Sequence, residues 1–212
     1  MGAARRWPAF ALSTLLAACA STPPPPDWQL NAKAASERSV AAYLNGNERI
    51  DAAELARARA EIARTGRADL LARVELTHCA AQVASLVFEA CSGFEALRAD
   101  APAAERAYAD YLAGRASAVD ASLLPEAQRA ASAASLTSIA DPLARLVAAG
   151  VLFETKRADP GVIQAAVDTA SAQGWRRPLL AWLGVQLARA EAAGAGDDAE
   201  RLRRRIARVG TP

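Results

Sequence analysis

Apolar positions recur every three or four residues along most of the chain beyond residue 27, and strict alternation of apolar and polar positions is absent. Because one face of an α-helix repeats every 3.6 residues, this spacing predicts amphipathic helices and an all-α fold. Between residues 68 and 88 two apolar stripes share one predicted helix, which indicates that neighbouring helices cover it on more than one side. The first stripe contains Leu70, Val74, Thr77, Ala81, Ala84 and Phe88, and the second contains Leu76, Val83 and Val87.

Residues that favour helix ends divide this pattern into segments. Asp141-Pro142 and Asp159-Pro160 each place a capping carboxylate before a proline, whose missing N–H costs nothing in the first turn of a helix. Asp51, with Glu54 three residues later, has the pattern of a capping box and predicts another start. The glycines expected just beyond helix ends are Gly46, Gly66, Gly114, Gly174 and Gly194. The predicted helices span residues 30–44, 51–64, 68–88, 102–113, 125–138, 141–156, 160–173, 177–193 and 197–208.

The predicted helix starts are evenly spaced near residues 141, 160, 178 and 197, which gives a two-helix unit of about 36 residues. Ala42-Tyr43-Leu44-Asn45-Gly46 is also similar to Asp110-Tyr111-Leu112-Ala113-Gly114. Trp182-Leu183-Gly184, with Leu187 and the segment from Asp198 to Ile206, resembles a degenerate tetratricopeptide (TPR) helix pair. This resemblance covers under half of the chain and implies an antiparallel helical array of the TPR-like α-solenoid kind. A compact helical bundle is the alternative.

The first 19 residues have the organisation of a secretion signal. Arg5 and Arg6 precede an apolar run from residue 7 to residue 18, which is shorter than the ~20 residues needed to span a bilayer. The run ends in Leu16-Ala17-Ala18-Cys19, which resembles the lipobox of bacterial lipoproteins. The alternative is an ordinary secretory signal that is cleaved near Ala20, so that Cys19 is lost.

The lipoprotein resemblance implies cleavage before Cys19 and attachment of acyl chains, such as palmitate, to this residue, which anchors the protein to a membrane. Ala20 and Ser21 follow the cysteine at positions where an aspartate would favour the inner membrane, so the resemblance implies the periplasmic face of the outer membrane. The expected parts are a signal peptide (1–18), a lipidated Cys19 with a proline-rich tether (19–27) and a periplasmic all-α domain (28–212). Four successive prolines favour an extended spacer in the tether.

Cleavage would also remove the excess positive charge of the chain. The sequence has 25 basic and 23 acidic residues, and loss of Arg5 and Arg6 leaves 23 of each sign. A protein without net charge has no long-range field that attracts the phosphates of DNA or RNA. We therefore expect no nucleic-acid partner.

Cys79 and Cys91 are the only other cysteines, and a compartment outside the cytoplasm favours disulfide formation. Twelve residues of unbroken helix would separate them by ~18 Å, far beyond the ~7 Å between Cα atoms that a disulfide can bridge. The predicted disulfide therefore requires the helix to end between them, and Ser92-Gly93 is a helix-breaking pair close by. Two buried free thiols are the alternative.

Residues with catalytic or metal-binding chemistry are few. His78 is the only histidine, and we interpret it as a packed or partly exposed helix residue because a metal site or a triad needs further partners. Nucleophile and phosphate-loop motifs are absent, so no catalytic residue, metal or cofactor is expected. Glu89 and Glu95 flank the predicted break. We interpret them as solvated loop residues and not as an acid–base pair, and a position that faces a groove is the alternative. Trp28 and Trp175 are interpreted as packing anchors, with a groove-lining role as the alternative.

The last predicted helix has acidic residues in its first turn and arginines after it. This order complements the helix dipole and is typical of a solvated terminal helix. A basic patch for phosphate or lipid headgroups is the alternative interpretation. The arginines are Arg201, Arg203, Arg204, Arg205 and Arg208.

The anchor and the fold class together favour a non-catalytic helical scaffold or adaptor that binds a protein or peptide partner in envelope assembly or maintenance. Two alternatives stay open: an envelope enzyme, for example one acting on peptidoglycan, and a helical bundle that binds a small molecule or lipid. An open groove would favour the scaffold, and an enclosed apolar cavity would favour the bundle. Clustered carboxylates, or a buried contact between His78 and a carboxylate in a cleft, would favour the enzyme.

Overall fold

The computed structural model describes Gly2 and residues 24–115, 120–129 and 131–210 of the chain. All regular structure in this part is helical, which confirms the predicted all-α class. The α-helices are α1 (Asp27–Leu44), α2 (Glu48–Ala63), α3 (Ala68–Ala84), α4 (Ser92–Glu95), α5 (Ala103–Leu112), α6 (Glu126–Arg129), α7 (Pro142–Glu154), α8 (Pro160–Gln173), α9 (Arg176–Ala192) and α10 (Gly196–Gly210). The short 3₁₀ helices are η2 (Ala121–Leu123) and η3 (Leu136–Ser138).

Helices α7 and α8 begin where the two Asp-Pro pairs predict. The side chain of Asp141 accepts a hydrogen bond from the backbone N–H of Ala144 at 2.6 Å, and that of Asp159 accepts one from Val162 at 2.9 Å. Each bond satisfies a backbone donor that the first turn leaves without an intrahelical partner. The five glycines predicted to follow helix ends all have φ between 67° and 80°, a left-handed conformation that glycine adopts without a Cβ penalty.

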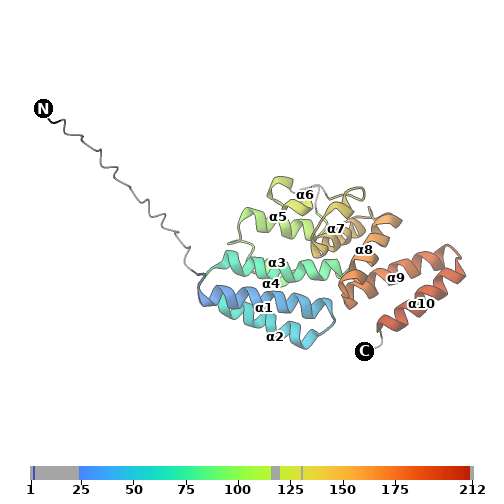
Figure 1. Cartoon of the computed structure of the whole chain (residues 1–212), viewed down its shortest axis with the longest axis horizontal. Coiled ribbons are helices and arrows are strands. Elements are labelled where there is room, and N and C mark those ends of the chain that lie inside the picture. The colour runs from blue at the N-terminus through green and yellow to red at the C-terminus, as the bar shows by residue number, and fades with distance from the viewer. Residues whose placement is uncertain (1, 3–23, 116–119, 130, 211–212) are drawn as a thin grey trace.

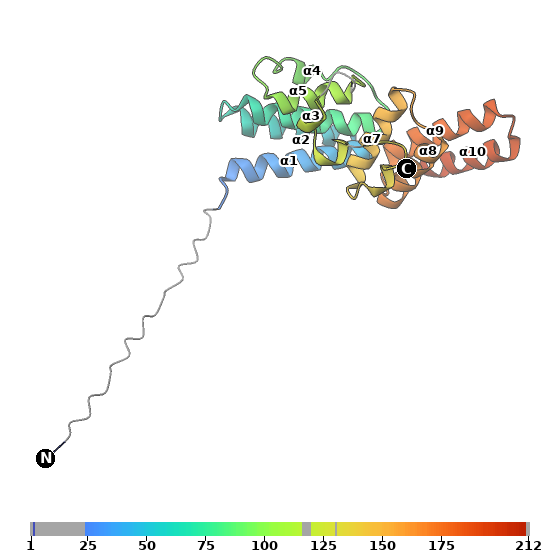
Figure 2. The same ribbon diagram turned by 90° about the horizontal axis from the view of Figure 1, so that it is seen from above.

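The helices form two groups that meet at the centre of the molecule. Figure 1 shows α1, α2 and α3 side by side near the N-terminal end of the domain, and α9 and α10 as a pair at the other end. Figure 2, seen from above, shows the same α9–α10 pair projecting from the rest of the molecule. From α7 to α10 each helix packs on the next along the chain, as in helical repeats, and α3 packs on α7 to join the two groups.

One contact connects helices that are far apart in the sequence. Arg177, in the first turn of α9, donates from Nε to the carbonyl oxygen of Tyr43 at 2.9 Å, across 134 residues. Its guanidinium also lies over the Tyr43 ring, 4.4 Å from the ring centroid. In a strictly linear array each unit contacts only its neighbours, so this α1–α9 contact departs from that pattern. The arrangement is compatible with a helical array or a bundle, and the solenoid stays a prediction.

The two similar pentapeptides of the sequence end two different helices in the same way. The first closes α1 and the second closes α5, and each buries its tyrosine and leucine in the interior. The backbone N–H of Gly46 donates to Tyr43 at 2.9 Å, and that of Gly114 donates to Tyr111 at 3.0 Å. The similarity therefore corresponds to a shared helix-ending motif, in which a left-handed glycine turns the chain over a buried tyrosine.

The centre of the core lies where α3, α7 and α9 meet. Trp182 of α9 is fully buried and donates from its indole N–H to the carbonyl oxygen of Ala84 at 3.0 Å. Its ring meets the ring of Phe153 edge-on, with centroids 5.7 Å apart. Gly150 of α7 faces Val83 of α3 so closely that an added Cβ would overlap the Val83 carbonyl. The backbones of α3 and α7 are therefore in near contact.

Several predicted helices differ from the observed ones in their ends or in their continuity. The helix predicted to start at Asp51 begins at Glu48, and Asp51 lies inside it, where its side chain accepts a buried hydrogen bond from Ser39 and does not cap the helix. The helix predicted over 125–138 is reduced to α6 and η3. The hydroxyls of Ser132 and Ser135 lie 3.0 Å apart and bond to nearby backbone groups, and such local bonds compete with helix formation.

Candidate functional site

The disulfide links α3 to the segment that follows it. Helix α3 ends at Ala84, before the predicted end at residue 88, and Leu86 turns the chain with a φ of 60°. This turn brings Cys91 back to Cys79, with 5.9 Å between their Cα atoms, and the two form a disulfide. The predicted pairing is confirmed, and the break that permits it lies before Cys91, not at the Ser-Gly pair after it.

Gly93 lets α4 approach α3 closely, directly after the disulfide. An added Cβ at this position would overlap the carboxylate of Glu75. Glu75 is only 5% exposed, and it accepts two hydrogen bonds from Arg59 of α2 at 2.5 and 2.6 Å. The segment after α3 is therefore fixed both by the covalent bond at Cys91 and by the packing of Gly93 on the buried carboxylate of Glu75.

A pocket of about 570 Å³ opens beside this disulfide, and we call it the disulfide pocket. It lies between the segment after α3, α4, the second half of α5 and the end of α7. Val83, Phe88 and Leu112 supply apolar lining. Glu89 and Glu95 both line the pocket, which agrees with the alternative interpretation of these two residues. The remaining lining residues are Cys79, Ala90, Cys91, Arg98, Ala109, Asp110, Ala113, Arg115 and Glu154.

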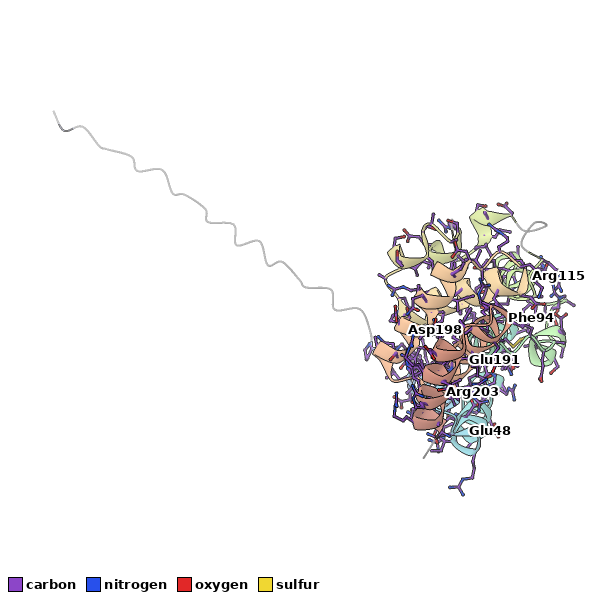
Figure 3. The ribbon with its side chains drawn as sticks, turned by 90° about the vertical axis from the view of Figure 1, so that its right-hand side faces the viewer. Glu48, Phe94, Arg115, Glu191, Asp198 and Arg203 are labelled. Atoms are coloured by element: carbon purple, nitrogen blue, oxygen red, sulfur yellow. A yellow bond between two sulfur atoms is a disulfide. The ribbon has the colours of Figure 1, made fainter. Side chains whose placement is uncertain are left out.

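Alternating charges follow one side of the disulfide pocket. Arg98 donates two hydrogen bonds to Glu95, at 2.7 and 2.8 Å, and one to Asp110 at 3.1 Å. Arg115 donates to the same oxygen of Asp110 at 2.6 Å. Arg98 also lies over the Phe94 ring at 5.1 Å, and Figure 3 shows Phe94 and Arg115 on the same side of the molecule.

Arg98 and Arg115 keep the carboxylates of Glu95 and Asp110 ionised. Hydrogen bonds from Arg98 lower the pKa of Glu95 below its ordinary value of 4.5. Burial raises the pKa of Asp110, but hydrogen bonds and charge from Arg115 and Arg98 outweigh this effect and bring the pKa below 3.8. A carboxylate that stays ionised at neutral pH has no proton to donate, so neither group is suited to act as a general acid there.

The disulfide pocket has an excess of negative charge. Glu89 and Glu154 add two carboxylates, and neither has an ion-pair partner among the residues that the structure describes. The lining therefore contains four acidic and two basic side chains. Charges of one sign in a cleft with low-dielectric walls concentrate their field there, so the pocket favours a cation.

A second cluster contains the residue types of a hydrolase triad in a different order. The hydroxyl of Ser39 donates to Asp51 at 2.6 Å, and Nε2 of His78 lies 3.0 and 3.1 Å from the two oxygens of the same carboxylate. A nucleophilic serine requires histidine as its neighbour to take its proton, whereas here the aspartate lies between them. The ring of Tyr43 meets His78 edge-on at 5.3 Å. The cluster therefore links α1, α2 and α3, and none of its members lines the disulfide pocket.

The other residues singled out in the sequence lie in packing positions or outside the described residues. Trp28 and Trp175 are partly buried against the core. The α10 arginines are largely paired, as in the contact of Arg203 with Glu191 at 2.5 Å, which Figure 3 shows on the last two helices. Cys19 and its lipobox-like motif lie outside the described residues.

In the described part of the chain, no group of three or more His, Cys, Asp or Glu side chains could hold a metal ion. No described helix has the length and apolar character needed to cross a bilayer. The chain matches no known family model, no curated protein and no solved structure.

Proposed function

We propose that this protein is a lipid-anchored scaffold at the periplasmic face of the bacterial outer membrane, whose helical domain binds a peptide segment of a protein partner. The disulfide pocket is the observation that carries this proposal. Its apolar side chains suit an aliphatic or aromatic residue of the partner, and its excess of carboxylates suits a lysine or arginine next to it. The role in envelope assembly or maintenance follows from the proposed location.

The lipobox-like motif that ends in Cys19 supports the anchor. Its test is expression of the full chain in a Gram-negative host, followed by membrane fractionation and mass spectrometry of the N-terminus. We expect acyl chains on Cys19, and release of the Cys19→Ala variant from the membrane fraction. An N-terminus without acyl chains, or a variant that stays in the membrane, would overturn the anchor.

Photo-crosslinking in whole cells tests the binding site. A photoreactive residue at Ala113, an exposed position on the pocket wall, is expected to form a discrete adduct with a partner. The same residue at Ala188, an exposed position on α9, provides the background. Reversing the pocket charge with Glu89→Arg should remove the adduct, whereas Glu200→Arg on α10 should not. An adduct that is equal at both positions, or that Glu89→Arg leaves unchanged, would contradict the proposal.

An acid–base enzyme is the second candidate, because four carboxylates share the disulfide pocket. Such an enzyme pairs a carboxyl group that keeps its proton near neutral pH with one that is ionised. The paired arginines keep Glu95 and Asp110 ionised, which favours binding over proton transfer. Incubation of the purified domain with peptidoglycan distinguishes the two candidates. Release of fragments that depends on Glu89 would support the enzyme.

A further inference from the structure

A second pocket, of about 390 Å³, lies between α3, the start of α5 and the segment from η2 to Pro125. It shares no lining residue with the disulfide pocket. We call it the Glu105 pocket after the single carboxylate in its wall. Its other lining residues are Arg73, Leu76, Thr77, Ala104, Tyr108, Leu123, Leu124 and Pro125.

The walls of the Glu105 pocket are mainly apolar. Leu76 and Leu124 are buried, and Leu123 at the mouth is 38% exposed, which is unusual for a large apolar side chain in this molecule. Burial raises the pKa of Tyr108 above its ordinary value of 10, so its hydroxyl is neutral over the physiological range. An apolar pocket with few polar groups is typical of small-molecule sites, in which those groups orient the ligand.

Glu105 has one carboxylate oxygen that is satisfied and one that is not. Oε1 accepts a hydrogen bond from Nε of Arg73 at 2.6 Å, and the residue is only 7% exposed. Oε2 is buried and has no hydrogen-bond partner, the single such side-chain atom in the described part of the chain. A buried acceptor without a hydrogen bond costs free energy. A donor that bonds to Oε2 therefore gains more free energy than a donor that bonds to an exposed oxygen.

The pairing with Arg73 decides what kind of donor the pocket favours. The guanidinium already supplies the positive charge that balances Glu105, so a second cation would meet repulsion from Arg73. A neutral N–H or O–H group supplies the missing hydrogen bond without that repulsion. We propose that the Glu105 pocket binds a small, neutral, largely apolar molecule that donates one hydrogen bond to Oε2, with an indole-type ring as its simplest representative.

Titration of the full chain with indole and with 1-methylindole, followed by NMR of the leucine methyl groups, tests this site. The two probes differ at the ring nitrogen, since the methyl group removes the donor. We expect both to shift Leu76 and Leu123, and we expect indole to bind about tenfold more tightly, the difference that one hydrogen bond to a buried acceptor makes.

Two variants make the test specific to this pocket. Leu123→Ala should weaken both probes equally, because it removes apolar contact and leaves Oε2 in place. Leu30→Ala, at an apolar residue of α1 that is 49% exposed, should change neither affinity. Equal affinities of the two probes for the unmodified chain would mean that the ring N–H does not reach Oε2, and methyl shifts outside the pocket would mean that the ligand binds elsewhere. Either result would overturn the proposal.

Discussion

The two helical groups of this molecule differ in the balance of forces that holds them together. An apolar cluster that includes Leu55, Ile62 and Val74 lies between α1, α2 and α3, but it is smaller than the apolar core around α7. Between α1, α2 and α3 the helices are joined by polar pairs, among them Arg38–Glu54, Ser39–Asp51 and Arg59–Glu75. From α7 to α9 the contacts are apolar, and α7 buries seven consecutive residues, 146–152. Ion pairs with a largely exposed arginine add little net stability, because water screens their attraction, whereas apolar burial contributes in proportion to its area. The larger apolar core around α7–α9 therefore supplies most of the stability, and the polar pairs fix how α1–α3 align.

The largest effect is expected at Trp182, the largest fully buried side chain. Trp182→Ala leaves a cavity between α3, α7 and α9, and should lower the free energy of unfolding by about 3–5 kcal/mol. Urea denaturation followed by circular dichroism measures this loss. Leu30→Ala, on the exposed face of α1, should change stability by under about 0.5 kcal/mol. A loss at Trp182 no larger than this control would contradict the comparison.

The disulfide lies between the two groups and should have the next largest effect. The double variant Cys79→Ser with Cys91→Ser opens a loop of 12 residues and should destabilise the domain by about 3 kcal/mol. The main reason is that the unfolded chain gains conformational entropy when the cross-link is removed. A reducing agent should lower the stability of the unmodified chain by a similar amount and leave the double variant unchanged. If the reducing agent affects both proteins equally, the disulfide is not the cause.

Gly150 and Gly184 provide a matched pair of helical glycines. Gly150→Ala places a Cβ against the Val83 carbonyl and forces α3 and α7 apart, which should cost about 1–3 kcal/mol. At Gly184 an added Cβ meets no neighbour within 4 Å, so Gly184→Ala should stabilise α9 by about 0.5–1 kcal/mol. Thermal unfolding of the two variants should therefore shift in opposite directions. Shifts of the same sign would show that α3 and α7 do not meet this closely.

The polar pairs between α1, α2 and α3 can be tested at Ser39 and Asp51. Asp51→Ala removes the acceptor of both Ser39 and His78, and should cost about 1–3 kcal/mol because buried donors are left unpaired. Adding Ser39→Ala should then cost less than it does alone, with a coupling energy of at least about 0.5 kcal/mol. Denaturation of the two single variants and the double variant gives this coupling. Additive losses would mean that the polar pairs do not act together.

The smallest effect concerns the charges of the disulfide pocket. The pKa of Glu95 is lowered by Arg98, so the pair stabilises the folded state above pH 4.5 and this contribution is lost as the pH falls through the lowered value. An NMR titration of the Glu95 carboxyl carbon should give a midpoint below 4.5. Arg98→Gln should move that midpoint upward, and an unchanged midpoint would contradict the ion pair.

Local signals predicted most helices, and tertiary contacts explain the exceptions. The pairs Asp141-Pro142 and Asp159-Pro160 act within one turn, so the sequence was sufficient to predict the starts of α7 and α8. Asp51 has the same local character as a cap, but its hydrogen bond to Ser39 of another helix keeps it inside α2. Capping patterns are not specific enough to reveal such a contact.

The disulfide pocket could be predicted in part. The geometry of an unbroken helix required a break between Cys79 and Cys91, and a position of Glu89 and Glu95 beside a groove was the alternative interpretation of these two residues. Glu95 and Arg98 are also three residues apart, a separation that a single turn of the chain brings together. By contrast, the contacts of Asp110 and Glu154 with this pocket depend on how α5 and α7 pack against the disulfide segment. No local pattern indicates that packing, and the same is true of the unpaired oxygen of Glu105.

The contact between Arg177 and Tyr43 has a consequence for how the domain loses its structure. A row of helices that touch only their neighbours can fray from either end, one unit at a time. Because Arg177 at the start of α9 is bonded to the end of α1, neither α1 nor α9 can separate without breaking a contact that spans 134 residues. Helix α10 packs mainly on α9 and lies outside this contact, so it can still separate first. Helices α1 and α9 should therefore lose their structure in one cooperative transition, at the same temperature by any probe.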